Sequence, residues 1–143
     1  MGIVNSLLLA AHLAGLAMIV GATLVLWRAG GVLARGEGSP GLTRLGERVI
    51  VLGDIGLGLN WISGPVMIFT KYGGFGAFVG LGPWFWLKLA FVVALSGMLG
   101  AAGGNFRRAR ADQTGAGGRI ERIGGIAALC ALGVIVSAAF TFG

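Results

Sequence analysis

Four long apolar segments constrain the fold of this chain more than any other feature: residues 3–26, 49–70, 84–103 and 123–142. About 20 apolar residues at a rise of about 1.5 Å each cross the roughly 30 Å hydrocarbon core of a bilayer as a helix. Only 11% of the residues are charged and 56% are hydrophobic. The sequence therefore predicts an all-α integral membrane protein, with residues 1–143 forming a single transmembrane domain of four helices.

The first apolar segment is interpreted as a retained helix. No basic region precedes it and no small-residue cleavage pattern follows it, whereas a removable signal peptide has both. Cys130 is the only cysteine, so a disulfide framework and a CxxCH haem-attachment motif are both excluded.

Basic residues gather in the two loops that join the first to the second and the third to the fourth segment. Short loops of this kind favour antiparallel neighbours, which predicts an up-down-up-down bundle. Because cytoplasmic loops of membrane proteins carry an excess of arginine and lysine, we expect both loops inside and both termini outside. The residues concerned are Arg28, Arg35, Arg44, Arg48, Arg107, Arg108, Arg110, Arg119 and Arg122.

The segment 71–83 between the second and third helices mixes glycine with aromatic residues, including Tyr72, Phe75 and Phe78. Aromatic rings settle at headgroup depth, so we expect an interfacial loop there. At the opposite interface we expect Trp27 and Phe106 to mark the same depth.

Small residues four apart occur within the apolar segments, at Ala17 and Gly21 and at Gly100 and Gly104, and the glycines at 53, 56 and 58 have a looser form of this spacing. In lipid, close backbone approach at such residues is a main source of helix packing. We interpret these pairs mainly as contacts within the chain. A homo-oligomer or a larger membrane complex, held through the same glycine-rich faces, stays open.

Four polar residues lie within the predicted spans: His12, Asp54, Asn60 and Lys88. An ionisable group there costs about 2.5–3.5 kcal/mol on insertion scales, so each is a functional hypothesis. From the rise per residue, His12 and Asn60 lie about 14–15 Å below the outer surface and Lys88 about 6–8 Å. Asp54 lies about 8 Å from the cytoplasmic end of its segment, where we expect it to meet Arg48 or another basic residue.

Each of these groups has a plain interpretation and a functional one. The amine of Lys88 either reaches outward to the headgroups beside tryptophan or points inward to hold a ligand. His12 is either a neutral histidine bonded across helices to Asn60 or Ser63, or an axial ligand for haem iron. Soluble-enzyme motifs are absent, since the sequence has no phosphate loop, zinc spacing or paired carboxylates.

Three stretches, "AHLAGLAMIVGA", "ERVIVLGDIGLGLNWISGPVMIF" and "WFWLKLAFVVALSGMLG", resemble a group of small bacterial membrane proteins that includes the HemJ-type protoporphyrinogen oxidases and the CopD-like membrane domains. The shared pattern covers roughly residues 8–110. After the first stretch, "TLVLWRAGGVLARG" lacks the aromatic and histidine-containing segment of the HemJ branch. The matching positions here are His12, Gly15, Arg48 (or Arg44), Ser63, Gly64, Trp84, Lys88, Leu89, Arg107 and Arg108.

The resemblance implies a bacterial inner-membrane protein that binds haem b or a porphyrin and acts as a membrane oxidoreductase on a porphyrinogen or an electron carrier. His12 would be the metal ligand, and Lys88 either the second axial ligand or the partner of a propionate. Asn60 and Ser63 would complete a polar pocket in the outer half of the bundle, with Arg48 as a further cofactor-binding residue. The alternative is a non-catalytic accessory subunit that stabilises a larger membrane complex.

Overall fold

The computed structural model describes residues 2–73, 76, 80–111 and 115–142. These residues form four long helices and no strand, which confirms the predicted all-α bundle. The helices are α1 (Ile3–Ala34), α2 (Pro40–Tyr72), α4 (Pro83–Arg110) and α5 (Ala116–Phe142).

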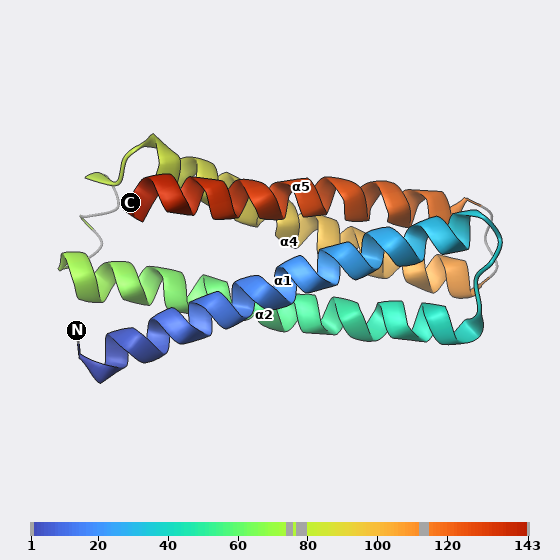
Figure 1. Cartoon of the computed structure of the whole chain (residues 1–143), viewed down its shortest axis with the longest axis horizontal. Helices are drawn as coiled ribbons and strands as arrows, with labels where there is room; N and C mark the ends of the chain where they lie inside the picture. The colour runs from blue at the N-terminus through green and yellow to red at the C-terminus, as the bar shows by residue number, and fades with distance from the viewer. Residues whose placement is uncertain (1, 74–75, 77–79, 112–114, 143) are drawn as a thin grey trace.

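The four helices run up-down-up-down around a common axis, and both termini lie at the same end of the bundle (Figure 1). Helix α1 packs between α2 and α5, while α4 packs closely on α5 and more loosely on α2. Helices α1 and α4 are therefore diagonal to one another, and any side chains that join them must reach across the bundle.

The helices extend beyond the apolar segments at the end opposite the termini. Helix α1 continues past residue 26 to Ala34, and α2 begins at Pro40 rather than near residue 49. The early start of α2 has a local cause: the Oγ of Ser39 accepts a hydrogen bond from the backbone N–H of Leu42, and proline follows in the first helical position. Serine caps orphan N–H groups and proline has none to satisfy there.

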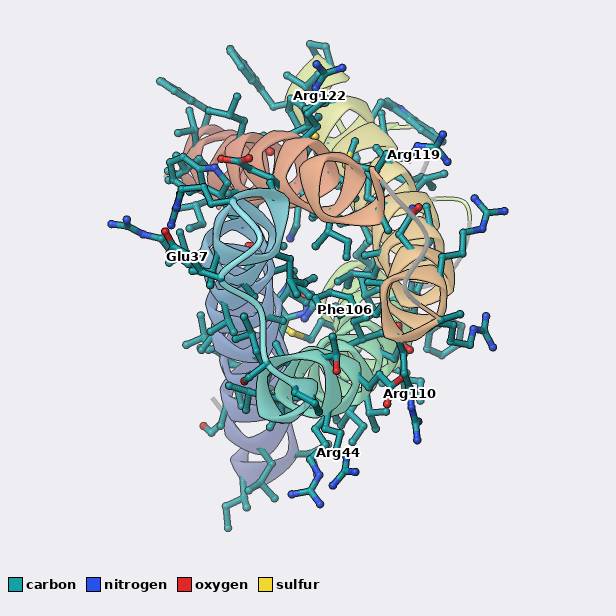
Figure 2. All side chains as sticks on the ribbon, turned by 90° about the vertical axis from the view of Figure 1, so that its right-hand side faces the viewer. Glu37, Arg44, Phe106, Arg110, Arg119 and Arg122 are labelled. Carbon is teal, nitrogen blue, oxygen red and sulfur yellow. The ribbon has the colours of Figure 1, made fainter. Side chains whose placement is uncertain are left out.

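The helix ends opposite the termini carry the basic residues. Figure 2 looks onto this end and shows Arg44, Arg110, Arg119 and Arg122 projecting outward around its rim. An ion pair of 3.7 Å between Arg110 and Glu47 joins α4 to α2 there. The molecule thus has one basic end, and the cytoplasmic location of that end is the prediction that follows from the arginine bias.

All four helices are long and apolar enough to cross a membrane. Their outward faces are rich in large apolar side chains, such as Leu7 (65% exposed), Ile62 (68%) and Leu129 (68%). Apolar exposure on this scale is unfavourable in water and favourable in hydrocarbon. The chain is therefore a multi-pass integral membrane protein in contact with the lipid bilayer.

Glycine sets the closest helix contacts, although at other positions than the four-residue spacings suggested. A Cβ on Gly15 of α1 would lie 2.7 Å from the carbonyl oxygen of Gly56 in α2, and one on Gly124 of α5 would lie 2.5 Å from the backbone nitrogen of Trp27. By contrast, a Cβ on Gly21 or Gly100 would meet nothing within 4 Å, and the same holds for Gly104. The expected packing within the chain is therefore wrong at these three glycines and at Gly58, whereas it is found at Gly53 and Gly56. Spacing alone does not say which face of a helix is buried.

One expectation about interfacial aromatic residues also changes. Phe106 is completely buried, with its ring against Gly46 of α2, so it is a core residue and not an interface marker. Trp27 is 45% exposed. At the other end, Trp84 stacks on Phe140 with ring centroids 4.8 Å apart, which ties the start of α4 to the end of α5. Of the predicted interfacial loop, residues 74–75 and 77–79, with both expected phenylalanine rings, lie outside the described residues.

Candidate functional site

His12 of α1 is held by Ser63 of α2. The Nδ1 atom of the imidazole lies 2.9 Å from the Oγ of Ser63, and that hydroxyl donates its own proton to the carbonyl oxygen of Leu59. A serine hydroxyl has one proton to donate. The oxygen of Ser63 must therefore accept from Nδ1–H, which leaves the Nε2 atom of His12 as the nitrogen with a free lone pair.

The amine of Lys88 in α4 faces that lone pair. Its Nζ atom lies 3.3 Å from Nε2 of His12, within hydrogen-bonding distance, and both side chains are half-buried. Of the two interpretations of Lys88, the structure has the inward one, because the amine is directed at the histidine. His12 follows the start of α1 by nine residues and Lys88 follows the start of α4 by five. His12 therefore lies deeper in the bundle, and the stem of Lys88 runs toward the middle of the bundle to reach it.

Asn60 supports the histidine through the backbone. Its side chain is buried, and its Nδ2 atom donates to the carbonyl oxygens of Gly56 (3.1 Å) and of His12 itself (3.4 Å). Both amide protons thus go to main-chain oxygens on two helices. Asn60 fixes where α1 crosses α2 and does not direct its amide at the imidazole ring.

The close crossing of α1 and α2 is what positions His12. Gly15 lies almost one turn after the histidine, and a Cβ there would come within 2.5 Å of Nδ2 of Asn60. Beside the ring, a Cβ on Gly64 would lie 3.7 Å from Cε1 of His12, so α2 passes the imidazole at ordinary contact distance. Pro65 follows within the same helix, where it lacks an N–H for the usual bond to the preceding turn.

The half of α1 that carries His12 is only partly covered by the other helices. No described residue of α1 before Gly15 is buried, and Leu7 and Leu13 are 65% and 55% exposed. Figure 1 shows the α1–α2 pair diverging from the α4–α5 pair toward the end that carries the termini. The histidine and lysine therefore meet in the open half of the bundle.

Two of the polar residues singled out in the sequence lie apart from this cluster. Arg48 is exposed and precedes Asn60 by 12 residues along α2, a distance of about 18 Å. Asp54 is also exposed and forms no ion pair within the described part of the chain, so the expected bond to Arg48 is not formed. The structure brings together His12, Ser63 and Lys88, with Asn60 behind them.

The sequence did not reveal the proton arrangement of the cluster. Leu59, whose carbonyl oxygen takes the proton of Ser63, is an ordinary apolar residue with no functional signal. The one available signal was the spacing of Leu59 and Ser63, since a serine hydroxyl in a helix often bonds to the carbonyl four residues earlier.

The arrangement offers an unprotonated imidazole nitrogen opposite a primary amine, which can bind a metal centre or exchange a proton. Within the described residues, His, Cys, Asp and Glu form no group of three or more that could hold a metal ion. No family model, curated protein or solved structure matches this chain.

Proposed function

We propose that this protein binds haem b or a related porphyrin at the His12–Ser63–Lys88 cluster, with Nε2 of His12 as an axial ligand. The observation that carries the proposal is the hydrogen bond from Nδ1 of the only histidine to Ser63, at 2.9 Å. Histidines that bind metals nearly always donate their other ring N–H in this way, which fixes the ring and raises the basicity of the ligating nitrogen.

The donor set fits a porphyrin better than a bare ion. A porphyrin brings its own equatorial nitrogens, so the protein has to supply only axial ligands, and a single histidine is one of the usual ones. Here the chain supplies one imidazole and one amine on opposing helices. When bound, haem supplies one-electron redox chemistry.

Lys88 suits a carboxylate partner. Its Nζ atom lies 3.3 Å from Nε2 of His12, so the amine would lie beside a porphyrin held by His12. In its protonated form, this amine would attract a propionate carboxylate strongly in a low-dielectric site.

The resemblance to the HemJ-type group extends the proposal to oxidoreductase chemistry, on a porphyrinogen or on an electron carrier of the membrane. In that chemistry the chain's own residues hold and orient. Ser63 keeps the proton on Nδ1, Asn60 fixes the crossing of α1 and α2, and the amine of Lys88 is the group best placed to take up or release a proton beside the ligand.

The test is a visible spectrum of the protein purified in mild detergent, as isolated and after titration with haem, in oxidised and reduced forms. We expect a Soret band that saturates at one haem per chain. In His12→Ala the band should be lost, and added imidazole should restore it by occupying the space of the missing ring.

A saturable Soret band that is unchanged in His12→Ala would place the haem elsewhere and contradict the proposal. A colourless protein that takes up no haem and co-purifies with a stoichiometric partner would contradict it as well. That second outcome would favour the accessory-subunit alternative.

A further inference from the structure

A groove between α1 and α5 lies far from the histidine and toward the basic end of the bundle. It has a volume of about 620 Å³, within the range of ordinary ligand sites. Its walls are almost entirely apolar, with Val20 and Leu24 on α1 and Ile126, Leu129 and Leu132 on α5. From Glu121 to Leu132 it follows α5 for 11 residues, which is about 16 Å.

The groove exists because glycine brings the two helices together on one side of it. A Cβ on Gly117 would lie 2.6 Å from the backbone nitrogen of Ala34, and one on Gly124 would lie 2.5 Å from that of Trp27. The indole of Trp27 lies over Gly125, with Nε1 3.5 Å from a Cβ placed there. Beside this close contact, the long apolar groove remains between α1 and α5.

Positive charge lies at the end of the groove nearer the basic end of the bundle. Arg122 lines the groove on α5, and the apolar residue Ile126 lies one turn below it on the same face. On α1, Arg28 is not a lining residue, but it lies one turn beyond the lining residue Leu24, on the same face of the helix and nearer the basic end. Neither arginine forms an ion pair with another described residue.

Glu121 also lines the groove, directly before Arg122 in the chain. Its Oε1 atom would lie 3.2 Å from a Cβ on Gly31, and Nη1 of Arg35 would lie 3.5 Å from the same point, so both groups lie over α1. Arg35 in turn forms an ion pair with Glu37 at 3.6 Å. Three arginines, Arg28, Arg35 and Arg122, against these two glutamates leave this end of the groove positively charged.

We propose that the α1–α5 groove is a binding site for one anionic phospholipid, whose acyl chain lies along the apolar walls and whose phosphate meets Arg28 and Arg122. Charge complementarity selects this occupant over a zwitterionic lipid, since basic pockets between helices at the cytoplasmic side recognise acidic headgroups. The proposal is independent of haem binding, because no residue of the His12–Ser63–Lys88 cluster lines this groove.

The test is native mass spectrometry of the detergent-purified protein incubated with phosphatidylglycerol or with phosphatidylcholine of the same acyl chains. We expect one phosphatidylglycerol to be retained well above phosphatidylcholine. Arg122→Gln should weaken that retention about fivefold, the effect of one basic residue near an acidic lipid surface. Ala128→Phe, which places a ring in the groove, should weaken the retention of both lipids.

The matched control is Arg44→Gln, which removes the same charge at the same end but on the opposite side of the bundle from Arg122 (Figure 2). It should leave retention unchanged. Equal losses in Arg44→Gln and Arg122→Gln would show a general effect of net charge and overturn the proposal, as would equal retention of the two lipids in the unmodified protein. Should Ala128→Phe fail to fold, the two arginine variants still decide.

Discussion

The chemical state of His12 follows from one proton on a neighbouring residue. Ser63 lies 2.9 Å from the imidazole and gives its only proton to the carbonyl oxygen of Leu59, so the histidine is held as the Nδ1–H form. The nitrogen that remains basic is the one that faces Lys88. A residue without a charge thereby decides which end of the histidine can bind a ligand.

Replacing Ser63 by alanine should therefore weaken haem binding without abolishing it. Loss of the partner to a ligating histidine typically costs about 10–100-fold in metal affinity. The measurement is a haem titration followed at the Soret band. Ser137→Ala is the control, because that serine is equally buried and also bonds to the carbonyl four residues earlier, but on α5. Equal effects of the two variants would show that Ser63 has no specific role.

Replacing Lys88 by methionine should distinguish its two proposed roles. As a propionate partner, Lys88 contributes to retention of the porphyrin, so the variant should bind haem more weakly while the ligation state of the iron stays the same. The measurement is the reduced visible spectrum together with the rate of haem loss to a scavenger protein. A change from six to five ligands at the iron would instead make Lys88 the second axial ligand.

The residues of the cluster were predictable from the sequence, but their geometry was not. His12 and Lys88 stood out because ionisable groups are costly in hydrocarbon, whereas Ser63 was suggested as a hydrogen-bond partner of His12 and by the resemblance. Whether the amine of Lys88 turned toward water or toward His12 depended on how far α1 and α4 lie apart, which no local pattern encodes. Arg48 was included on the strength of a short motif, and its exposed position about 18 Å along the helix from Asn60 separates it from the cluster.

Among the elements, the crossing of α1 and α2 leaves little room for a larger residue. Gly15→Ala should destabilise the bundle by about 1–3 kcal/mol, since the new Cβ would meet a backbone oxygen that cannot move aside. Gly21→Ala on the same helix meets nothing within 4 Å, so it should be neutral or stabilising by up to about 1 kcal/mol. Unfolding in mixed detergent micelles, followed by circular dichroism, compares the two. A neutral Gly15→Ala would contradict the close crossing.

The number, order and type of the helices were predictable from hydropathy, but their ends were not. Hydropathy marks only the part of a helix that lies in hydrocarbon, and the described helices continue through the charged residues at the basic end. Ser39 and Pro40 did carry a start signal for α2, because that pair supplies a cap and a residue that needs no hydrogen-bond acceptor. The same two residues also suit a turn, and the sequence alone did not separate these uses.

For the whole molecule, we expect the basic end to face the cytoplasm. In a Cys130→Ala background, a cysteine introduced at Arg108 should be protected from a membrane-impermeant maleimide in intact cells and labelled after permeabilisation. A cysteine at Gly82, at the opposite end, should be labelled in intact cells. Both sites are exposed and lie at or near helix ends. The reverse labelling pattern would show that the arginine bias does not set the orientation of this bundle.

The central proposal for the whole molecule is a direct bond between His12 and a bound haem. Because His12 is the only histidine in the chain, protein made with ¹⁵N-labelled histidine carries a single labelled imidazole. Pulsed electron paramagnetic resonance of the oxidised haem complex should then show hyperfine coupling from one axial ¹⁵N nucleus. A haem complex without that coupling, or a protein that forms no haem complex, would contradict the central claim.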